Sequence, residues 1–213
     1  MQLVDMLLSN RVNTFAEIVV NSKCTNLFNN PIDLESALTQ VMNCLHELIK
    51  TNNKLYIIGN GGSAAVASHA LVDFVNVAKI QAQVLHESSL MTCMANDYGY
   101  ENVYSRTLST YMKKEDILIA ISSSGKSLNI CNAAKVAKEK DAKVVTLTGF
   151  SENNPLRKLG DYNFWLNSED YGYVEVGHQF ILHNLSDRFG AERIKDFLIT
   201  ETETPATCVN KVR

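Results

Sequence analysis

The sequence predicts an α/β fold, a single three-layer domain in which a parallel sheet of about five strands is flanked by helices. Short, almost continuously apolar runs alternate along the chain with longer segments of helical spacing. This alternation is typical of parallel strands that helices cover on both faces. The chain has 213 residues, which is enough for one sizeable domain of this class.

The N-terminal part of the chain is predicted to be helical. Residues 2–26 carry apolar side chains at helical spacing, which favours one long amphipathic helix. This helix precedes the first strand, so it packs either on a partner chain or on its own domain. The first alternative leads us to expect an oligomer. A second helix is predicted from Asn30-Pro31-Ile32-Asp33 to about Thr51, with proline near its first turn.

The rest of the chain supplies the sheet and its covering helices. Strands are predicted near 55–58, 81–85, 116–121, 143–148 and 162–166, and helices from 63, over 88–94, 102–111 and 127–140, from 154, and over 174–198. A polar loop is predicted over 95–100. The predicted domain spans 1–200, with residues 1–50 serving oligomerisation, and a loose tail follows over 201–213.

Composition argues against several classes of protein. The net charge is −3 without a long basic run, which argues against a nucleic-acid partner. The N-terminus lacks a signal-peptide pattern and no apolar run approaches about 18 residues, which argues against secretion or a membrane span. Five scattered cysteines without a CxxC motif resemble reduced thiols and predict a cytoplasmic location.

The first candidate site follows the apolar run at 55–58. It continues as Gly59-Asn60-Gly61-Gly62-Ser63, and Ser63 is expected to cap the following helix. A glycine-rich turn before a helix N-terminus can bind an anion. His69 and Asp73 lie four residues apart on one face of that helix, where they could bind a metal or move protons.

The second candidate site is the loop Ser122-Ser123-Ser124-Gly125-Lys126-Ser127. It satisfies a loose P-loop pattern, in which Lys126 would contact nucleotide phosphates. The first glycine of that pattern is missing, however, and no apolar strand ends in an aspartate for magnesium. Four hydroxyls near one helix N-terminus suit a phosphate monoester better. An ordinary serine-rich turn stays the alternative.

Four motifs carry a resemblance to a known family over roughly residues 50–190. Strand-SSSGKS-helix resembles the sugar-phosphate loop of the SIS (sugar isomerase) domain family. GNGGSAAVASH, ANDYGYENVYSR and EVGHQFILH are similar to three motifs of its phosphoheptose isomerase subgroup. The resemblance implies a flavodoxin-like SIS fold in a cytosolic homotetramer. It also implies conversion of sedoheptulose 7-phosphate to D-glycero-D-manno-heptose 7-phosphate, for the heptose of lipopolysaccharide or other surface glycans.

The resemblance also implies roles for individual residues. Phosphate would bind to the serines, which are Ser122, Ser123, Ser124 and Ser127. Other substrate contacts would come from Asn60, Gly61, Gly62, Asn96, Asp97 and Glu175. One zinc ion per subunit would be held by His69, Asp73, Glu175 and His183. Asp73 and His183 would also form the acid/base pair.

The chain departs from this family at Asp73, where the family has Glu, and at Glu175, where it has Gln. Glu175 and His183 are eight residues apart, about 12 Å of helix rise, so a shared metal requires convergent side chains, a helix that starts after Glu175, or different subunits. Taken singly, the histidines could be ordinary core or surface residues. A non-catalytic SIS protein that binds a sugar phosphate or a partner, and isomerisation of a hexose or pentose phosphate, stay open as alternatives.

Overall fold

A seven-stranded sheet with the order β2-β1-β7-β6-β5-β3-β4 organises the chain. A computed structural model describes residues 6–203, with side chains described for residues 6–193. Five strands are parallel, as the sequence predicts: β3 (Leu55–Ile58), β4 (Ala82–Val84), β5 (Ile117–Ser122), β6 (Lys143–Thr148) and β7 (Tyr162–Trp165). The apolar side chains of β3, β5 and β6, in the middle of the sheet, are buried on both faces, so the pairing register is strongly specified there.

Two short strands complete one edge of the sheet and correct the predicted helix over 2–26. Helix α1 covers only Leu8–Val20, and β1 (Lys23–Asn26) then pairs antiparallel with β7 and with β2 (Pro31–Ile32). The Asn26 side chain accepts hydrogen bonds from the backbone N–H groups of Phe28 and Asn30, which reverses the chain between the two strands. Residues 1–5 of the predicted helix lie outside the described part.

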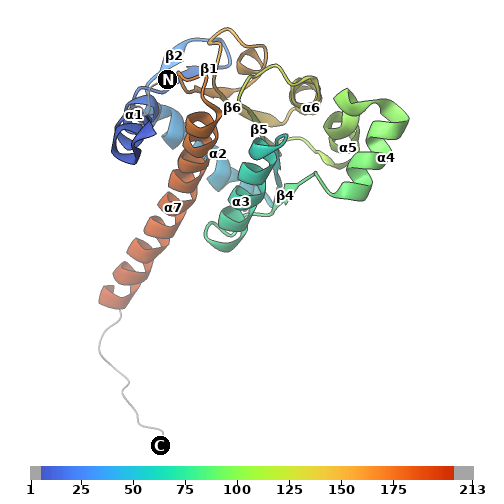
Figure 1. Ribbon diagram of the computed structural model, residues 1–213. Helices are drawn as coiled ribbons and strands as arrows, with labels where there is room; N and C mark the ends of the chain where they lie inside the picture. The colour runs from blue at the N-terminus through green and yellow to red at the C-terminus, as the bar shows by residue number, and fades with distance from the viewer. Residues whose placement is uncertain (1–5, 204–213) are drawn as a thin grey trace, which may run out of the picture.

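Helices cover both faces of the sheet and enclose two separate cores (Figure 1). Leu55 and Ile57 point into a core shared with α2 (Leu34–Thr51), α3 (Gly62–Asn76) and α7 (Tyr171–Glu203). Tyr56 and Ile58 point into the opposite core, which α5 (Val103–Tyr111) and α6 (Leu128–Glu139) help to form. The period-two alternation along β3 thus separates the two helical layers. Helix α4 (Ser88–Tyr98) and the 3₁₀ turns η2 (Tyr100–Asn102) and η3 (Leu156–Lys158) complete the described elements.

Several predicted helix boundaries are wrong by a few residues. Helix α2 begins after Asp33, whose carboxylate accepts a hydrogen bond from the Ser36 N–H. Ser63 is not the cap of α3, because Gly61 occupies that position with φ +51°. Such a positive φ favours glycine.

The other differences lie in α4 and α7. Helix α4 continues to Tyr98, so Asn96 and Asp97 are helical rather than in a loop. Helix α7 begins at Tyr171 and includes residues 201–203 of the predicted tail, whereas residues 204–213 lie outside the described part. None of the helices within residues 6–203 is long and apolar enough to cross a membrane.

Candidate active site

A cavity of about 240 Å³ lies at the carboxyl ends of β3 and β5, between the two loops that the sequence singles out. In a parallel sheet this edge is the usual ligand site. Eight of the ten predicted substrate-binding residues line it, and the full lining is Asn60, Gly61, Gly62, Ser63, Ile121, Ser122, Ser123, Ser124, Ser127, Tyr171 and Glu175.

 The two predicted substrate residues outside this lining are Asn96 and Asp97, so eight of the ten surround one cavity.

The cavity is built to receive an anion. Helices α3 and α6 both begin at it, and neither Gly61 nor Ser127, at their N-caps, makes a side-chain capping hydrogen bond. The first N–H groups of both helices therefore receive no hydrogen bond from an N-cap side chain, and such groups bind phosphate well. Ser122 Oγ donates to Ser127 Oγ at 3.3 Å, and Ser123 Oγ is buried without a hydrogen-bond partner among the described residues.

A pair of amides joins the two loops across the sheet. Asn60 Nδ2 donates to Asn129 Oδ1, and Asn129 Nδ2 donates to Asn60 Oδ1, each at 2.9 Å. Tyr100 Oη donates to the same Asn60 oxygen at 3.1 Å. Sequence reasoning missed Asn129, which lies two residues after the serine loop. The sequence signal that could have found Asn129 is its position, just after the serine loop and in the first turn of the next helix.

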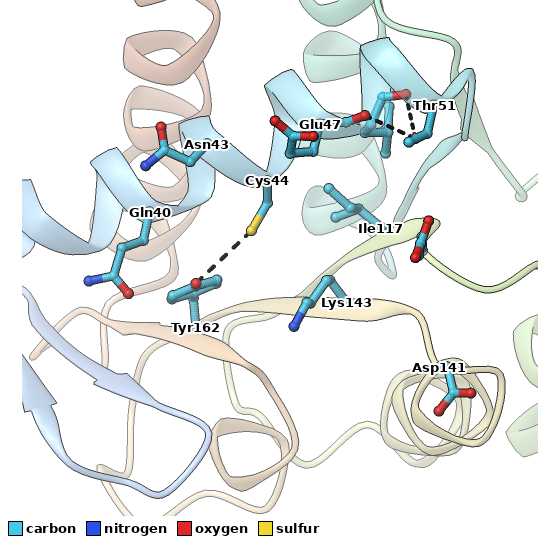
Figure 2. A pocket seen from close by; sticks show the side chains of 11 residues that line it. Gln40, Asn43, Cys44, Glu47, Thr51, Ile117, Asp141, Lys143 and Tyr162 are labelled. Carbon is cyan, nitrogen blue, oxygen red and sulfur yellow. Dashed lines mark hydrogen bonds between the residues drawn. The ribbon is translucent and has the colours of Figure 1, made fainter.

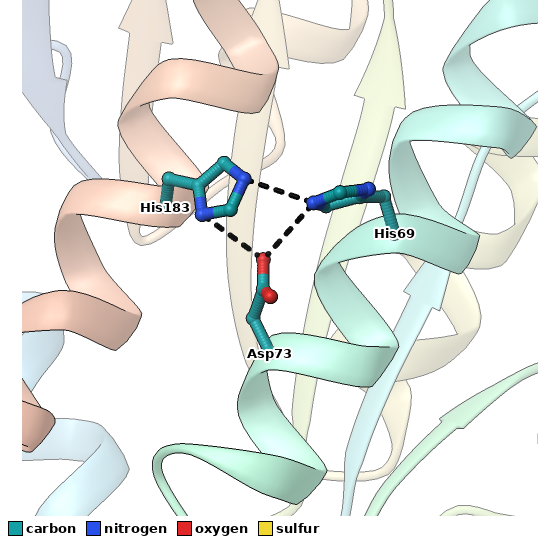
Figure 3. Close-up of side chains that lie close together, drawn as sticks. All are labelled: His69, Asp73 and His183. Carbon is teal, nitrogen blue, oxygen red and sulfur yellow. Dashed lines mark hydrogen bonds and ion pairs between the residues drawn. The ribbon is translucent and has the colours of Figure 1, made fainter.

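A second group of polar side chains lies between α3 and α7 (Figure 3). His69 and Asp73 come from α3, as their i and i+4 spacing predicts, and His183 comes from α7. His69 Nε2 lies 2.9 Å from His183 Nε2, and Asp73 Oδ2 lies 3.2 Å from His183 Nδ1 and 3.6 Å from His69 Nε2. We call these three residues the histidine–aspartate cluster.

The histidine–aspartate cluster could hold a metal ion. One ligand atom from each residue lies within 4.8 Å of the others. Ligand atoms of a tetrahedral zinc ion are roughly 3.3 Å apart, given bond lengths near 2.0 Å, which the observed separations bracket. Asp73 Oδ2 is buried and has no well-aligned hydrogen bond among the described residues. Two imidazole nitrogens and a carboxylate oxygen without a hydrogen-bond donor suit a divalent transition metal.

Glu175 does not join this cluster within one chain, so its role as a metal ligand stays a prediction. It lies on α7, which is helical from Tyr171, so about 12 Å of rise separates it from His183. Its carboxylate lies instead against Gly62, where any added Cβ would collide with it. This position therefore supports the other predicted role of Glu175, which is contact with the substrate.

Asn96 and Asp97 lie on the exposed surface of α4, outside the cavity lining. Asn96 Nδ2 donates to Asp97 Oδ1 at 3.0 Å. The same motif reaches the cavity through Tyr100, by way of its hydrogen bond to Asn60. The predicted contacts of Asn96 and Asp97 with substrate stay predictions.

Comparison with known proteins decides the family. The SIS domain profile matches residues 22–149. A phosphoheptose isomerase from Helicobacter pylori (strain ATCC 700392 / 26695) is 34% identical over 160 residues, covering 72% of this chain and 83% of that protein. The chain belongs to the phosphoheptose isomerases of the SIS domain family. This membership is what the motifs around the two loops indicate.

Solved phosphoheptose isomerase structures share the fold. The protein from Francisella tularensis superposes with a TM-score of 0.75 at 23% identity, covering 89% of this chain and 98% of that one. The protein from Neisseria gonorrhoeae superposes with a TM-score of 0.68 at 26% identity, covering 87% of this chain and 100% of that one. The fold prediction is thus confirmed.

His178, in the last of the phosphoheptose isomerase motifs, has a structural role. It is fully buried, and its Nε2 lies 3.1 Å from the Thr148 carbonyl oxygen at the end of β6. Burial lowers the pKa of His178 to about 4, so the imidazole is neutral at pH 7 and Nε2–H donates to the carbonyl. This histidine therefore attaches α7 to the sheet and holds the helix that carries Glu175 and His183.

A larger cavity, of about 530 Å³, lies at the opposite end of the strands (Figure 2). Ile117 and Lys143 line it from the first residues of β5 and β6, and Cys44 from α2 lies 4.0 Å from Tyr162 Oη. None of the predicted site residues lines this cavity. The candidate active site is therefore the cavity at the carboxyl edge rather than this larger one.

Proposed function

We propose that the chain is an aldose–ketose isomerase that converts sedoheptulose 7-phosphate to D-glycero-D-manno-heptose 7-phosphate through an enediol intermediate. One observation carries the proposal. Helices α3 and α7 both line the candidate phosphate cavity, and the same two helices carry the histidine–aspartate cluster, which has acid/base groups. Membership of the phosphoheptose isomerases supports this assignment.

The distance between the two sites favours a long substrate. Gly62 and His69 are seven residues apart on α3, about 10 Å of helix rise. An opened seven-carbon sugar with its phosphate spans roughly 10 Å, from bond lengths near 1.5 Å. In the proposed pose the phosphate binds at the serine loop, with Ser122, Ser123, Ser124 and Ser127, and the carbonyl end reaches the histidine–aspartate cluster.

The proposed chemistry is a proton transfer between neighbouring carbons. Asp73 or His183 removes the proton from the carbon beside the carbonyl, and the other group donates a proton to the carbonyl oxygen, which gives the enediol. Return of a proton to the former carbonyl carbon, with loss of the hydroxyl proton on the other enediol carbon, gives the aldose and completes the isomerisation. Asp73 Oδ2 lies 3.2 Å from His183 Nδ1, close enough for the two groups to act on the same part of the substrate. Asn60, Gly61 and Gly62 would position the sugar beside this pair.

Zinc is the proposed cofactor, at one ion per subunit. His69, Asp73 and His183 would hold it, and the donor set and spacing described above support this assignment. A bound zinc ion would supply polarisation of the substrate oxygens. Glu175 would be a fourth ligand only if it came from another subunit, because about 12 Å of helix separates it from His183 of its own chain.

A homotetramer is the proposed assembly. Several large apolar side chains on α1, α3 and α7 are exposed in the single chain, namely Leu8, Val12, Val72, Val176 and Phe180. None of the residues of α1 is buried. Exposed apolar side chains in such numbers are typical of a protein interface. Light scattering after size exclusion should give four times the chain mass of 23.7 kDa, and a monomer would contradict this assembly.

A cytoplasmic location is also part of the proposal. Four cysteines of the described residues, Cys24, Cys44, Cys93 and Cys131, are free thiols, which supports a reducing compartment. The heptose product would serve lipopolysaccharide or other surface glycans.

Incubation with sedoheptulose 7-phosphate in deuterated water tests the proposed activity. We expect aldose product with deuterium at C2, because the base exchanges its proton with solvent before returning it. Absence of both product and deuterium would instead favour a non-catalytic SIS protein that binds a sugar phosphate. A parallel series with pentose and hexose ketose phosphates tests the preference for seven carbons.

A further inference from the structure

A further cavity, of about 710 Å³, lies at the β1–β2 edge of the sheet, and we call it the edge cavity. Its volume falls in the range typical of ligand sites. The β1–β2 hairpin forms one side, and the segment after β6 with η3 forms the other. The lining consists of Ser22, Lys23, Cys24, Thr25, Asn29, Pro31, Ile32, Glu152, Asn153, Arg157 and Lys158.

Arg157 is the main reason to regard the edge cavity as a site. Its exposed fraction is only 9%, although it carries a permanent charge. Its Nη1 donates to the Glu152 carbonyl oxygen at 3.1 Å and to the Glu152 carboxylate at 3.3 Å. Its Nε is buried and has no hydrogen-bond partner among the described residues. One edge of the guanidinium is therefore paired and the other lacks an acceptor.

Thr25 supplies a second buried group without a partner on the opposite side of the edge cavity. Its exposed fraction is 8%, and its Oγ1 makes no hydrogen bond to any described residue. A buried hydroxyl or N–H without a partner costs about 1–3 kcal/mol, so such groups are normally satisfied by a ligand or water. Two of them in one cavity, both able to donate, indicate an acceptor-rich occupant.

The charges around the edge cavity indicate that the occupant is an anion. Lys23, Arg157 and Lys158 are positive, and Glu152 is the one carboxylate in the lining. Glu152 is already shared, since it lies 2.9 Å from Lys23 Nζ and 3.3 Å from Arg157 Nη1. Burial raises the pKa of the Cys24 thiol to about 12, so the thiol adds no negative charge. Two positive charges are thus left in excess.

We infer that the edge cavity binds a phosphate monoester dianion, at a site separate from the serine loop. An excess of two positive charges matches the charge of a phosphomonoester, and Arg157 and Thr25 would donate to its tetrahedral oxygens. The exposed side chain of Lys158 also lines the cavity, makes no hydrogen bond or ion pair with the described residues, and would pair with the anion. The two sites are connected, because Leu156 N, beside Arg157, donates to the Gly125 carbonyl oxygen of the serine loop at 3.0 Å.

Calorimetric titration with inorganic phosphate at pH 8 tests this site. A full-length S123A/S127A chain removes two hydroxyls of the serine loop, so that the remaining phosphate binding reports the edge cavity. In that background we expect R157M to weaken phosphate binding at least about tenfold, and K158Q to weaken it about two- to fivefold. K114Q is the matched control, because Lys114 is exposed and lies outside the edge cavity.

The K158Q variant distinguishes loss of the binding site from loss of folding. Lys158 is exposed, so K158Q should keep the melting temperature of the parent chain. The inference is contradicted if the S123A/S127A chain binds no phosphate, or if K158Q and K114Q bind it equally well. Raising the salt concentration should weaken phosphate binding at the edge cavity, because salt screens the charges of its exposed lysines.

Discussion

Asn60 and Asn129 exchange two hydrogen bonds of 2.9 Å, and in this way the glycine-rich turn after β3 is fixed to the helix that follows the serine loop. Asn129 has an exposed fraction of only 2%, and its Oδ1 also accepts from the Ile130 N–H. Both amides are therefore oriented before substrate arrives. Asn129 is a positioning residue, since it acts on the proposed site through Asn60.

Replacement of Asn129 by alanine should lower kcat/KM about tenfold. The Asn60 amide would lose its fixed orientation, and misplaced binding groups cost catalysis steeply. Steady-state kinetics measures this effect, and N132A is the matched control because Asn132 lies on the same helix and donates to the Glu101 carbonyl oxygen instead. A merely structural role would lower the melting temperature of N129A while leaving the kcat/KM of the folded fraction unchanged.

Replacement of Asp73 by asparagine should reduce kcat about 100- to 10,000-fold, the range of a lost general acid or base. The amide keeps the shape of the side chain but cannot accept a proton at Oδ2, the atom that faces both histidines. Measurement of deuterium exchange at C2 separates this loss from weaker binding. D187N, a change of the same kind at an exposed position of α7, should keep full activity.

Much of this site could be predicted from local sequence, and the exceptions have a common cause. The apolar run at β3, the glycine turn and the spacing of His69 and Asp73 lie within one short segment, so local patterns determine them. The β1–β2 hairpin escaped prediction because its strand partner β7 is more than 130 residues away. The Asn60–Asn129 pair likewise depends on the pairing of β3 with β5. His183 was accessible only through the family motif, because no local spacing links it to α3.

Replacement of Glu175 by glutamine should strengthen phosphate binding. The Glu175 carboxylate lines the same cavity of about 240 Å³ as the four serines, and a like charge at short range opposes a bound phosphate. We expect inorganic phosphate to inhibit E175Q at about fivefold lower concentration than the parent chain. E169Q, another carboxylate change just before α7, should leave the inhibition constant unaltered. Equal inhibition of both variants would place the phosphate elsewhere.

Removal of one imidazole should abolish stoichiometric zinc. Loss of His69 or His183 leaves the cluster with two ligands, too few for tight zinc binding. Elemental analysis of dialysed protein should give about one zinc per chain for the parent and well below that for H69A and H183A. H46A is the control, because His46 pairs with Glu192 at 3.0 Å outside the cluster. Equal zinc content in all four proteins would exclude the cluster as the zinc site.

The buried His178 should make stability fall as the pH falls below about 6.5. Burial lowers the folded-state pKa of His178 from 6.5 to about 4, so between these values the unfolded chain binds a proton that the folded chain excludes. The contribution of neutral His178 is fully present above pH 6.5 and decreases through this window, by about 2 kcal/mol at pH 5.

Urea unfolding of the parent and of H178N at pH 7.5 and pH 5 measures this contribution. Asparagine cannot take up a proton in this range, so the stability difference between the two pH values should be about 2 kcal/mol smaller for H178N. H46N, at a histidine whose side chain is 37% exposed, should keep most of the pH dependence of the parent. If the parent and H178N lose the same free energy of unfolding between the two pH values, His178 is protonated in the folded chain and the Nε2–H bond to Thr148 does not hold α7 in the way described.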